Sequence, residues 1–498
     1  MEAITLGFQS LFMHPSVPAL MVFGVFFGII FGAIPGLTAT LGVMLMIPFT
    51  FTMNAEQGLA LLVGIYVGGI SGGLITATLI NIPGTPSSIV TCWDGYPMAK
   101  NGKPGEALAI GVFASLVGGT VSALALFTIA PLLAKVALKM QSWELFAVCL
   151  MGLAIVAVMT SEDVIKGLLG TFIGLLLGTI GMDVILGNSR WTFGKWQLMN
   201  GIQATALMMA LFAVREILDQ STRLHEKRPK MTLKKVTFIP PFRELRDSWK
   251  AMGIGSVFGT LIGILPGIGQ NASTILAYNQ AKAISKHPEN FGKGTPEGIC
   301  ASESSNNAVN GGALIPLVTL GIPGDMVTAA LIGGLTIHNL QPGPRLFVDQ
   351  PAVVGTIMAV YFLANIVMYV MELGLMKAFI KMIEVRLSFL FPAVIIFCVL
   401  GVYALNSLTF DIWILVIFAA VGYILNQFKI DLVSIILGFI LGPLIEKYFK
   451  TGMILAEGNF GEILKHPIAV VFLAIALAFF IAPPVLRALK TQKAKAVI

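Results

Sequence analysis

The sequence predicts an all-α, polytopic membrane protein of about 10–12 transmembrane segments in two structurally related repeats with broken helices or re-entrant hairpins. The first observation is composition: 56% of the 498 residues are hydrophobic and 11% are charged, against roughly 25% charged residues in an average soluble domain. The second is that residues 3–55 and 57–93 contain no Asp, Glu, Lys or Arg. The third is a pattern of Gly and Pro residues that occurs twice along the chain.

The first repeat is expected over residues 1–214 and contains a helix with regularly spaced glycines. Gly24, Gly28, Gly32 and Gly36 recur at every fourth position. Glycines at this spacing share one helix face and let another backbone approach closely. The series ends at Pro35-Gly36, where we expect the helix to break, because Pro removes a helical hydrogen bond and Gly tolerates unusual dihedral angles.

A second break is expected within residues 76–88, between long apolar segments. This stretch has two prolines, one glycine and six hydroxyl or amide side chains, with no charged residue. Unpaired backbone at membrane depth costs several kcal/mol per group unless protein, water, ion or solute satisfies it. The sequence therefore predicts that this segment lines a polar cavity.

The central segment, residues 215–250, is the most basic part of the chain and is predicted to be a cytoplasmic loop. Basic residues accumulate in the cytoplasmic loops of membrane proteins. The formal charge of +7 is explained in this way, and no nucleic-acid partner is expected.

The second repeat is expected over residues 251–464, because the same signals return in the same order. Gly255, Gly259, Gly263 and Gly267 match the first glycine series at an offset of 231, and Gly321-Ile322-Pro323-Gly324 matches Asn81-Ile82-Pro83-Gly84. Residues 465–498 are predicted to be an additional helix and basic tail. An odd number of crossings in each repeat would place the central loop and the C-terminus on the same side, so we expect the repeats to be inverted.

The predicted sites lie at the breaks, near the bilayer midplane. The N-terminus of a half-helix has free N–H groups and a partial positive charge, so it can bind a carboxylate without a buried arginine. Exposed carbonyl and side-chain oxygens suit Na⁺. The predicted substrate-binding residues are Asn81, Pro83, Gly84, Thr85, Ser87, Ser88, Asn306, Asn307, Asn310, Pro323, Gly324 and Asp325. The predicted coupling-ion residues are Thr38, Thr40, Gln270, Asn271 and Ser273.

Other chemistries are not indicated. The four cysteines are isolated from one another, so no metal other than Na⁺ and no cofactor is expected. No phosphate-binding loop is present, and the chain is not expected to be an enzyme. The sequence leaves open the roles of Glu303, Asp325 and His338, although a carboxylate within a membrane segment is a candidate for cation or proton coupling.

These motifs resemble the large membrane subunit of the tripartite tricarboxylate transporter family. The resemblance covers nearly the whole chain; it is carried by residues 32–37, 68–84, 94–99, 265–267 and 306–324, and by His338 with Gln341-Pro342-Gly343-Pro344. It implies an importer of tricarboxylates or related small carboxylates in the bacterial inner membrane, driven by Na⁺ or H⁺. It also implies two partners, a small membrane subunit of four helices and a periplasmic solute-binding protein.

Two alternative functions remain open at this point. The same helix breaks can form the filter of a passive anion channel, or the chain can be a permease subunit energised by a separate ATPase. The sequence also leaves open whether the protein forms a homo-oligomer.

Overall fold

The computed structural model describes residues 2–159, 163–183, 185–221, 238–239, 241–383 and 387–495. The chain folds into two compact units, each made from two separate stretches of sequence. Unit 1 contains Met1–Lys135 and Thr205–Tyr423, and unit 2 contains Val136–Ala204 and Ile424–Ile498. Each predicted repeat therefore contributes chain to both units.

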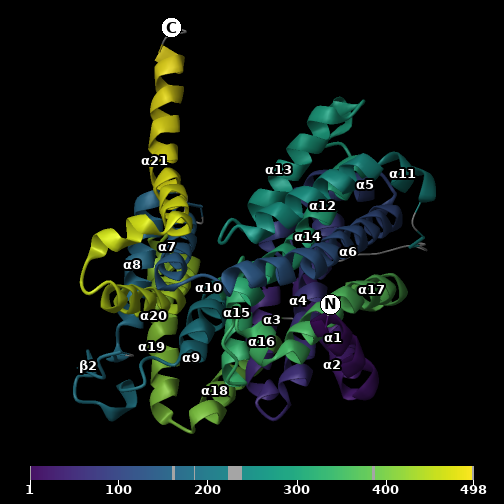
Figure 1. The fold of residues 1–498 in the computed structure, drawn as a ribbon. Coiled ribbons are helices and arrows are strands. Elements are labelled where there is room, and N and C mark those ends of the chain that lie inside the picture. Colours follow the sequence, from purple (N-terminus) through teal and green to yellow (C-terminus); the bar gives the residue numbers. More distant parts are fainter. Residues whose placement is uncertain are drawn as a thin grey trace. The chain divides into compact units, whose positions relative to one another are not determined.

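Unit 1 is built from helices and short helical turns (Figure 1). Three of its helices, α6, α9 and α19, extend past its bounds. Its elements are α1 (Glu2–Met13), α2 (Ser16–Ala33), α3 (Ala39–Thr50), α4 (Ala55–Ile80), η1 (Pro86–Ser88), α5 (Ile89–Lys100), α6 (Pro104–Ala137), α9 (Ala204–Met208), η3 (Met209–Val214), α10 (Arg215–Ser221), α11 (Phe242–Asp247), α12 (Trp249–Ile264), α13 (Gly269–Ile284), η4 (Pro288–Asn290), α14 (Pro296–Leu320), α15 (Met326–Ile337), α16 (Leu346–Asp349), α17 (Pro351–Met382), α18 (Leu387–Asn406) and α19 (Thr409–Gln427).

Unit 2 contains the remaining elements. They are α7 (Ser142–Met159), α8 (Val164–Gly178), β1 (Gly181–Met182), β2 (Ser189–Arg190), η2 (Trp196–Leu198), α20 (Leu432–Leu455), η5 (Phe460–Lys465) and α21 (Pro467–Lys495). The two strands form a short antiparallel pair in which Gly181 faces Arg190. Figure 1 shows α21 running out past α7, α8 and α20 of the same unit. The predicted additional C-terminal helix is therefore present as α21.

Lengths and composition confirm an all-α polytopic membrane protein. Among the described residues, six helices are long and apolar enough to cross a membrane, namely α2, α4, α6, α17, α19 and α20. Several shorter apolar helices accompany them, including α3, α12 and α15. Some of these are short because their segments are interrupted by Pro-Gly sequences. The number of crossings and the inverted relation of the repeats stay predictions.

The core of unit 1 is formed by α4 and α14. All residues of α4 from Gly58 to Leu79 are buried, and so are all residues of α14 from Gly298 to Thr319. Helix α2 packs along α4, and helix α12 packs along α14. A helix that is buried on every side has no face left for lipid or water. Its polar side chains are therefore enclosed by protein.

The predicted central loop contains short helices at both ends. Helix α10 begins at Arg215, α11 lies at Phe242–Asp247, and α12 begins at Trp249. Residues 222–237 and 240, with most of the basic side chains, lie outside the described residues. The domain boundaries drawn from the sequence stay predictions.

Candidate functional site

The regularly spaced glycines form backbone contacts between helices. A methyl group added to Gly28 of α2 would lie 2.4 Å from the carbonyl oxygen of Ile65 in α4. One added to Gly259 of α12 would lie 2.4 Å from the carbonyl oxygen of Ser305 in α14. These distances are shorter than any van der Waals contact, so only glycine permits this packing. Both glycine series therefore hold a helix against a buried core helix.

Each glycine-lined helix ends at its Pro-Gly sequence, as predicted. Helix α2 ends at Ala33 and α12 ends at Ile264. Gly36 has a φ of +91° and Gly267 a φ of +78°. Residues other than glycine rarely adopt such φ values. A new helix then starts in each repeat, α3 after the first break and α13 after the second.

The core helices end at the second pair of predicted breaks. Helix α4 terminates at Asn81 and α14 at Gly321, both in the left-handed conformation, with φ of +58° and +73°. An Ile-Pro-Gly sequence follows each of them. Asn is one of the few residues with a side chain that tolerates this region. The two repeats thus use different residues for the same turn.

Within each repeat the two breaks lie next to each other. The Gly84 amide donates to the Gly73 carbonyl oxygen over 3.3 Å, and a methyl group on Gly84 would lie 2.2 Å from the carbonyl oxygen of Gly32. In the second repeat, the Gly267 amide donates to the carbonyl oxygen of Gly324 over 3.0 Å. In the second repeat a backbone group at one break is thus satisfied at the other.

Four helical segments begin after these breaks. Two of them have an N-terminal side-chain cap and two do not. Thr38 caps α3 by accepting from the Leu41 amide over 3.1 Å, and Asp325 caps α15 by accepting from the Thr328 amide over 2.7 Å. The starts of η1–α5 and of α13 have no side-chain cap. Uncapped N-termini keep free N–H groups and a partial positive charge.

The elements that begin at the two uncapped starts contact each other, since η1 and α5 both contact α13. Buried hydroxyl groups lie at this position. Thr85 Oγ1 is 3.0 Å from Ser87 Oγ and 2.9 Å from Ser88 Oγ, and Ser273 Oγ of α13 is 2.7 Å from Ser305 Oγ of α14. This arrangement of N–H and hydroxyl groups favours an anion.

The Asp325 side chain accepts hydrogen bonds from residues of three helices, α4, α13 and α15. Its Oδ2 accepts from the Tyr66 hydroxyl of α4 and from Gln270 Nε2 of α13, each over 2.5 Å. Its other oxygen accepts from the amide and hydroxyl of Thr328. The structure therefore joins Gln270, a predicted coupling-ion residue, to Asp325, a predicted substrate residue. Four hydrogen bonds thus reach the Asp325 carboxyl group, two at each oxygen.

The asparagines of α14 are completely buried. Asn307 Nδ2 donates to Ser115 Oγ of α6 over 2.8 Å and to the carbonyl oxygen of Glu303 over 3.2 Å. Its Oδ1 and both side-chain polar atoms of Asn310 have no hydrogen-bond partner in the described part of the chain. Leaving such groups unpaired costs about 1–3 kcal/mol each. An enclosed solute, ion or water would satisfy them.

Other predicted site residues are placed less centrally. Asn81 and Asn271 are exposed, Thr38 and Pro83 are half-buried, and Thr40 and Gly84 are buried. Pro323 and Gly324 are buried beside α12 and α14. His338 lies at the end of α15, where its Nε2 would be 2.5 Å from a methyl group on Gly58.

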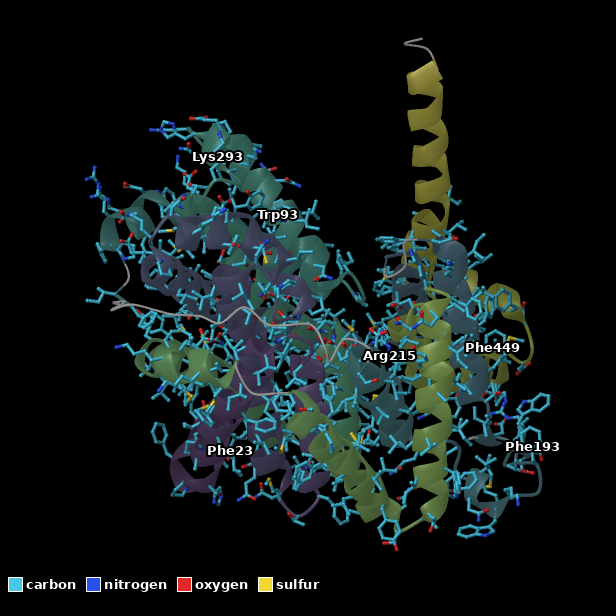
Figure 2. The ribbon with its side chains drawn as sticks, turned by 180° about the vertical axis from the view of Figure 1, so that it is seen from behind. Phe23, Trp93, Phe193, Arg215, Lys293 and Phe449 are labelled. Carbon is cyan, nitrogen blue, oxygen red and sulfur yellow. The ribbon has the colours of Figure 1, made fainter. Side chains whose placement is uncertain are left out.

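The middle of α5 is fixed by a buried carboxylate, Asp94. Its Oδ1 accepts from the amides of Gly292, Gly294 and Thr295 over 2.8–3.0 Å, and its Oδ2 accepts from the Tyr278 hydroxyl over 2.7 Å. Figure 2 shows Trp93 and Lys293 together at one end of unit 1, with Phe23 at the other end. The contact ties α5 to α13 and to the start of α14.

Sequence reasoning missed Glu372 of α17, which is fully buried and accepts from Ser71 Oγ over 3.0 Å. It also missed Tyr66, Thr91 and Ser115. Glu372 is the only acid in α17, and a lone carboxylate in an apolar segment is itself a signal. Ser71 lies in Gly69-Ile70-Ser71-Gly72-Gly73, which fits the GxSxG pattern. It is inside a continuous helix, however, and not at the strand-to-helix turn that a nucleophile requires.

Comparison with known proteins gives a family match. The model of the tripartite tricarboxylate transporter TctA family matches residues 19–437. An uncharacterised 52.8 kDa protein in the TAR-I ttuC' 3' region of Agrobacterium vitis is 35% identical over 480 residues, covering 95% of this chain and 94% of that protein.

A second relative comes from the same organism. An uncharacterised protein in the TAR-II ttuC' 3' region of Agrobacterium vitis is 35% identical over 219 residues, covering 44% of this chain and 90% of that protein. No solved structure matches. The resemblance seen in the motifs is confirmed: the chain is a multi-pass membrane protein that belongs to the tripartite tricarboxylate transporter TctA family.

Proposed function

We propose that this chain is an ion-coupled secondary transporter that imports tricarboxylates or related small carboxylates across a bacterial inner membrane. A periplasmic solute-binding protein delivers the solute, and a small four-helix membrane subunit completes the assembly. Family membership supports the assembly. The structural observation that carries the proposal is the contact between two elements that begin without a side-chain cap, η1–α5 and α13, each of which carries buried hydroxyl groups.

The chemistry of this position suits a carboxylate. Thr85 of the first repeat bonds Ser87 and Ser88 at the start of η1, and η1 contacts α13 of the second repeat. The N–H groups of both starts and these hydroxyls supply donors without a positive side chain, so a solute can be released as well as bound. Ser273 and Ser305 extend the set of hydroxyls towards the asparagines of α14.

The coupling ion is Na⁺ or H⁺ in this proposal. Asp325 and the hydroxyls of Thr38 and Thr40 supply oxygen atoms suited to a cation. The Gln270–Asp325 bond links that region to the start of α13. Through it, occupancy of the cation region and of the carboxylate region would influence one another.

The test is uptake of labelled citrate and other carboxylates by the reconstituted chain with its two expected partners in liposomes. Ser88→Ala removes one donor to a charged solute and should raise the half-saturating concentration about tenfold, since such bonds contribute about 1.5–3 kcal/mol. The control is Thr128→Ala, whose exposed hydroxyl bonds only carbonyls of its own helix.

Three results would contradict the proposal. Uptake that never exceeds equilibrium under an imposed Na⁺ or proton gradient would indicate a channel. Uptake that requires ATP would indicate an ATPase-driven permease. Equal half-saturating concentrations in Ser88→Ala and Thr128→Ala would show that the carboxylate does not bind at this position.

A further inference from the structure

Two carboxylates are enclosed in the core of unit 1 with no cationic partner. Glu303 of α14 and Glu372 of α17 are both 0% exposed. None of the partners described for either carboxylate carries a charge. Glu303 accepts from Thr91 of α5 and from Ser115 of α6, and Glu372 accepts from Ser71 of α4. No ion pair within the described residues includes either one.

The two carboxylates belong to one cluster. A methyl group on Gly111 of α6 would lie 3.3 Å from Leu74 Cδ1 of α4 and 3.6 Å from Glu303 Cγ. Leu74 is one helical turn after Ser71, the donor to Glu372. Helices α4, α6, α14 and α17 therefore converge on this cluster.

Unpaired polar atoms at the cluster indicate a missing ligand. Glu372 Oε1 is buried and has no hydrogen-bond partner in the part of the chain that is described. Asn307, also 0% exposed, points its Nδ2 at Ser115 and leaves its Oδ1 unpaired. Burying an ionised carboxylate without a counter-charge costs several kcal/mol, and such a group is neutralised instead. A proton is the counter-charge that needs no additional cavity.

A multivalent metal does not fit this position. Among the described residues, no three His, Cys, Asp or Glu side chains gather in a way that could hold a metal ion. The hydroxyls of Thr91 and Ser71 direct their hydrogens at the carboxylates. A buried carboxylate with hydroxyl donors and no counter-charge is an arrangement that can bind and release a proton.

We propose that Glu303 and Glu372 form a buried two-carboxylate site that carries the coupling proton. This inference rests on the proposed transport function and names the coupling ion. The proton comes from water on the outer side, binds a carboxylate oxygen of the pair, and leaves to water on the inner side. No other bond changes. Ser115 donates to Glu303 Oε2 over 3.2 Å and accepts from Asn307 Nδ2 over 2.8 Å. Protonation of Glu303 therefore acts on a predicted substrate residue through one hydroxyl.

The surroundings contain few other titratable groups. Cys92 of α5 follows Thr91, the donor to Glu303, and Tyr361 of α17 donates to the Asn307 carbonyl oxygen over 3.2 Å. From α4 and α6 the groups facing the pair are the hydroxyls of Ser71 and Ser115. Asp94 of α5 is held elsewhere, by Tyr278 and the start of α14. Neither a thiol nor a phenol replaces a carboxylate as a proton carrier near neutral pH.

The test combines an infrared measurement with transport, both on the full chain. Infrared spectra of the protein in lipid, recorded as the pH is raised, should show loss of a protonated-carboxyl band. Glu303→Gln and Glu372→Gln should each change that band, while the control Glu106→Gln, an exposed residue paired with Lys103, should not. This measurement needs no solute, so its outcome is independent of the transported carboxylate.

The transport measurement uses liposomes containing the chain and its two expected partners. With labelled citrate, an inward proton gradient should accelerate uptake by the natural protein and by Glu106→Gln. In Glu372→Gln this acceleration should be at least tenfold smaller. The variant should still exchange internal for external citrate, because exchange needs no net proton release. Ser71→Ala keeps the carboxylate and should move half-maximal uptake to higher pH, because the ionised form loses its donor.

The outcomes separate the two proposals. Absence of citrate exchange by the natural protein, with the infrared band present and sensitive to both variants, would count against citrate transport and leave the proton site standing. Normal gradient-driven uptake by Glu303→Gln and Glu372→Gln would overturn the proton site. An infrared band that neither variant alters, or uptake driven by Na⁺ with no proton movement, would also overturn it.

Discussion

Asn310 lies in the middle of α14 with both polar side-chain atoms buried and unpartnered among the described residues. Such an amide lowers stability, so its presence calls for a ligand. Asn310→Leu should leave the thermal midpoint unchanged or raise it, because an unpaired group is replaced by an apolar one of similar size. The same change should reduce citrate uptake at least tenfold. A lower midpoint with normal uptake would show that Asn310 has a structural partner.

Single residues also show where sequence reasoning reached its limit. Asp325 was singled out because it follows a Pro-Gly break, and it does cap α15. Its bond to Tyr66 joins residues 259 positions apart, and no local pattern encodes such a contact. Glu372 was missed because no repeated motif surrounds it. Its significance depends on Ser71, which is 301 positions away.

Asp183, in the connection after α8 of unit 2, gives a pH-dependent prediction. Lys450, with the amides of Leu186 and Ile185, holds the pKa of this carboxyl well below its usual range. A lowered pKa stabilises the fold above the ordinary value of about 4 and loses that contribution as pH falls. Hydrogen exchange at Leu186 and Gly187, corrected for intrinsic rates, should therefore rise in acid. In Asp183→Asn this added acid sensitivity should be absent, and identical profiles would contradict the assignment.

At the scale of elements, α12 offers a matched pair of glycines. A methyl group on Gly259 would lie 2.4 Å from the Ser305 carbonyl oxygen, whereas one on Gly253 would have nothing within 4 Å. Gly259→Ala should therefore destabilise the protein by about 1–3 kcal/mol through overpacking. Gly253→Ala should be neutral or stabilise it by about 0.4–1 kcal/mol, since Ala is the better helix former. Thermal unfolding in detergent measures both, and equal midpoints would refute the close contact.

The same elements show which features the sequence could predict. The four-residue glycine spacing and the Pro-Gly sequences marked the helix contacts and the helix ends, because both follow from local backbone chemistry. The pairing of α3 with α15 and of α5 with α13 was not predictable. It depends on packing between distant segments, for which one sequence contains no signal.

At the scale of the molecule, these pairings bear on the relation of the two repeats. Helix α3 corresponds to α13, and α5 corresponds to α15, so a two-fold operation exchanges the two pairs. Figure 1 shows α5 and α13 at one end of unit 1 and α3 and α15 away from that end. In an inverted arrangement, a two-fold axis in the membrane plane would exchange the two ends of the protein. The inverted relation therefore stays a prediction, and it has a direct test.

Inverted repeats predict opposite sidedness for equivalent turns. Asn101, after α5, and Gln341, after α15, are both exposed and separated by the offset of the Ile-Pro-Gly sequences. The four native cysteines are buried, so labelling of an introduced cysteine has a low background. In intact cells a membrane-impermeant maleimide should label only one of Asn101→Cys and Gln341→Cys, and permeabilised cells should show both. Labelling of both variants in intact cells would indicate parallel repeats.

The glycine contacts also restrict how unit 1 can move. Because α2 meets α4, and α12 meets α14, at distances that leave no space for a single added methyl group, neither pair can slide or roll without a collision of main-chain atoms. Each pair therefore moves as one rigid body. Any opening towards either side of the bilayer must occur at the ends of these helix pairs. There the chain can rotate about the left-handed residues Asn81 and Gly321 and about the neighbouring Pro-Gly sequences.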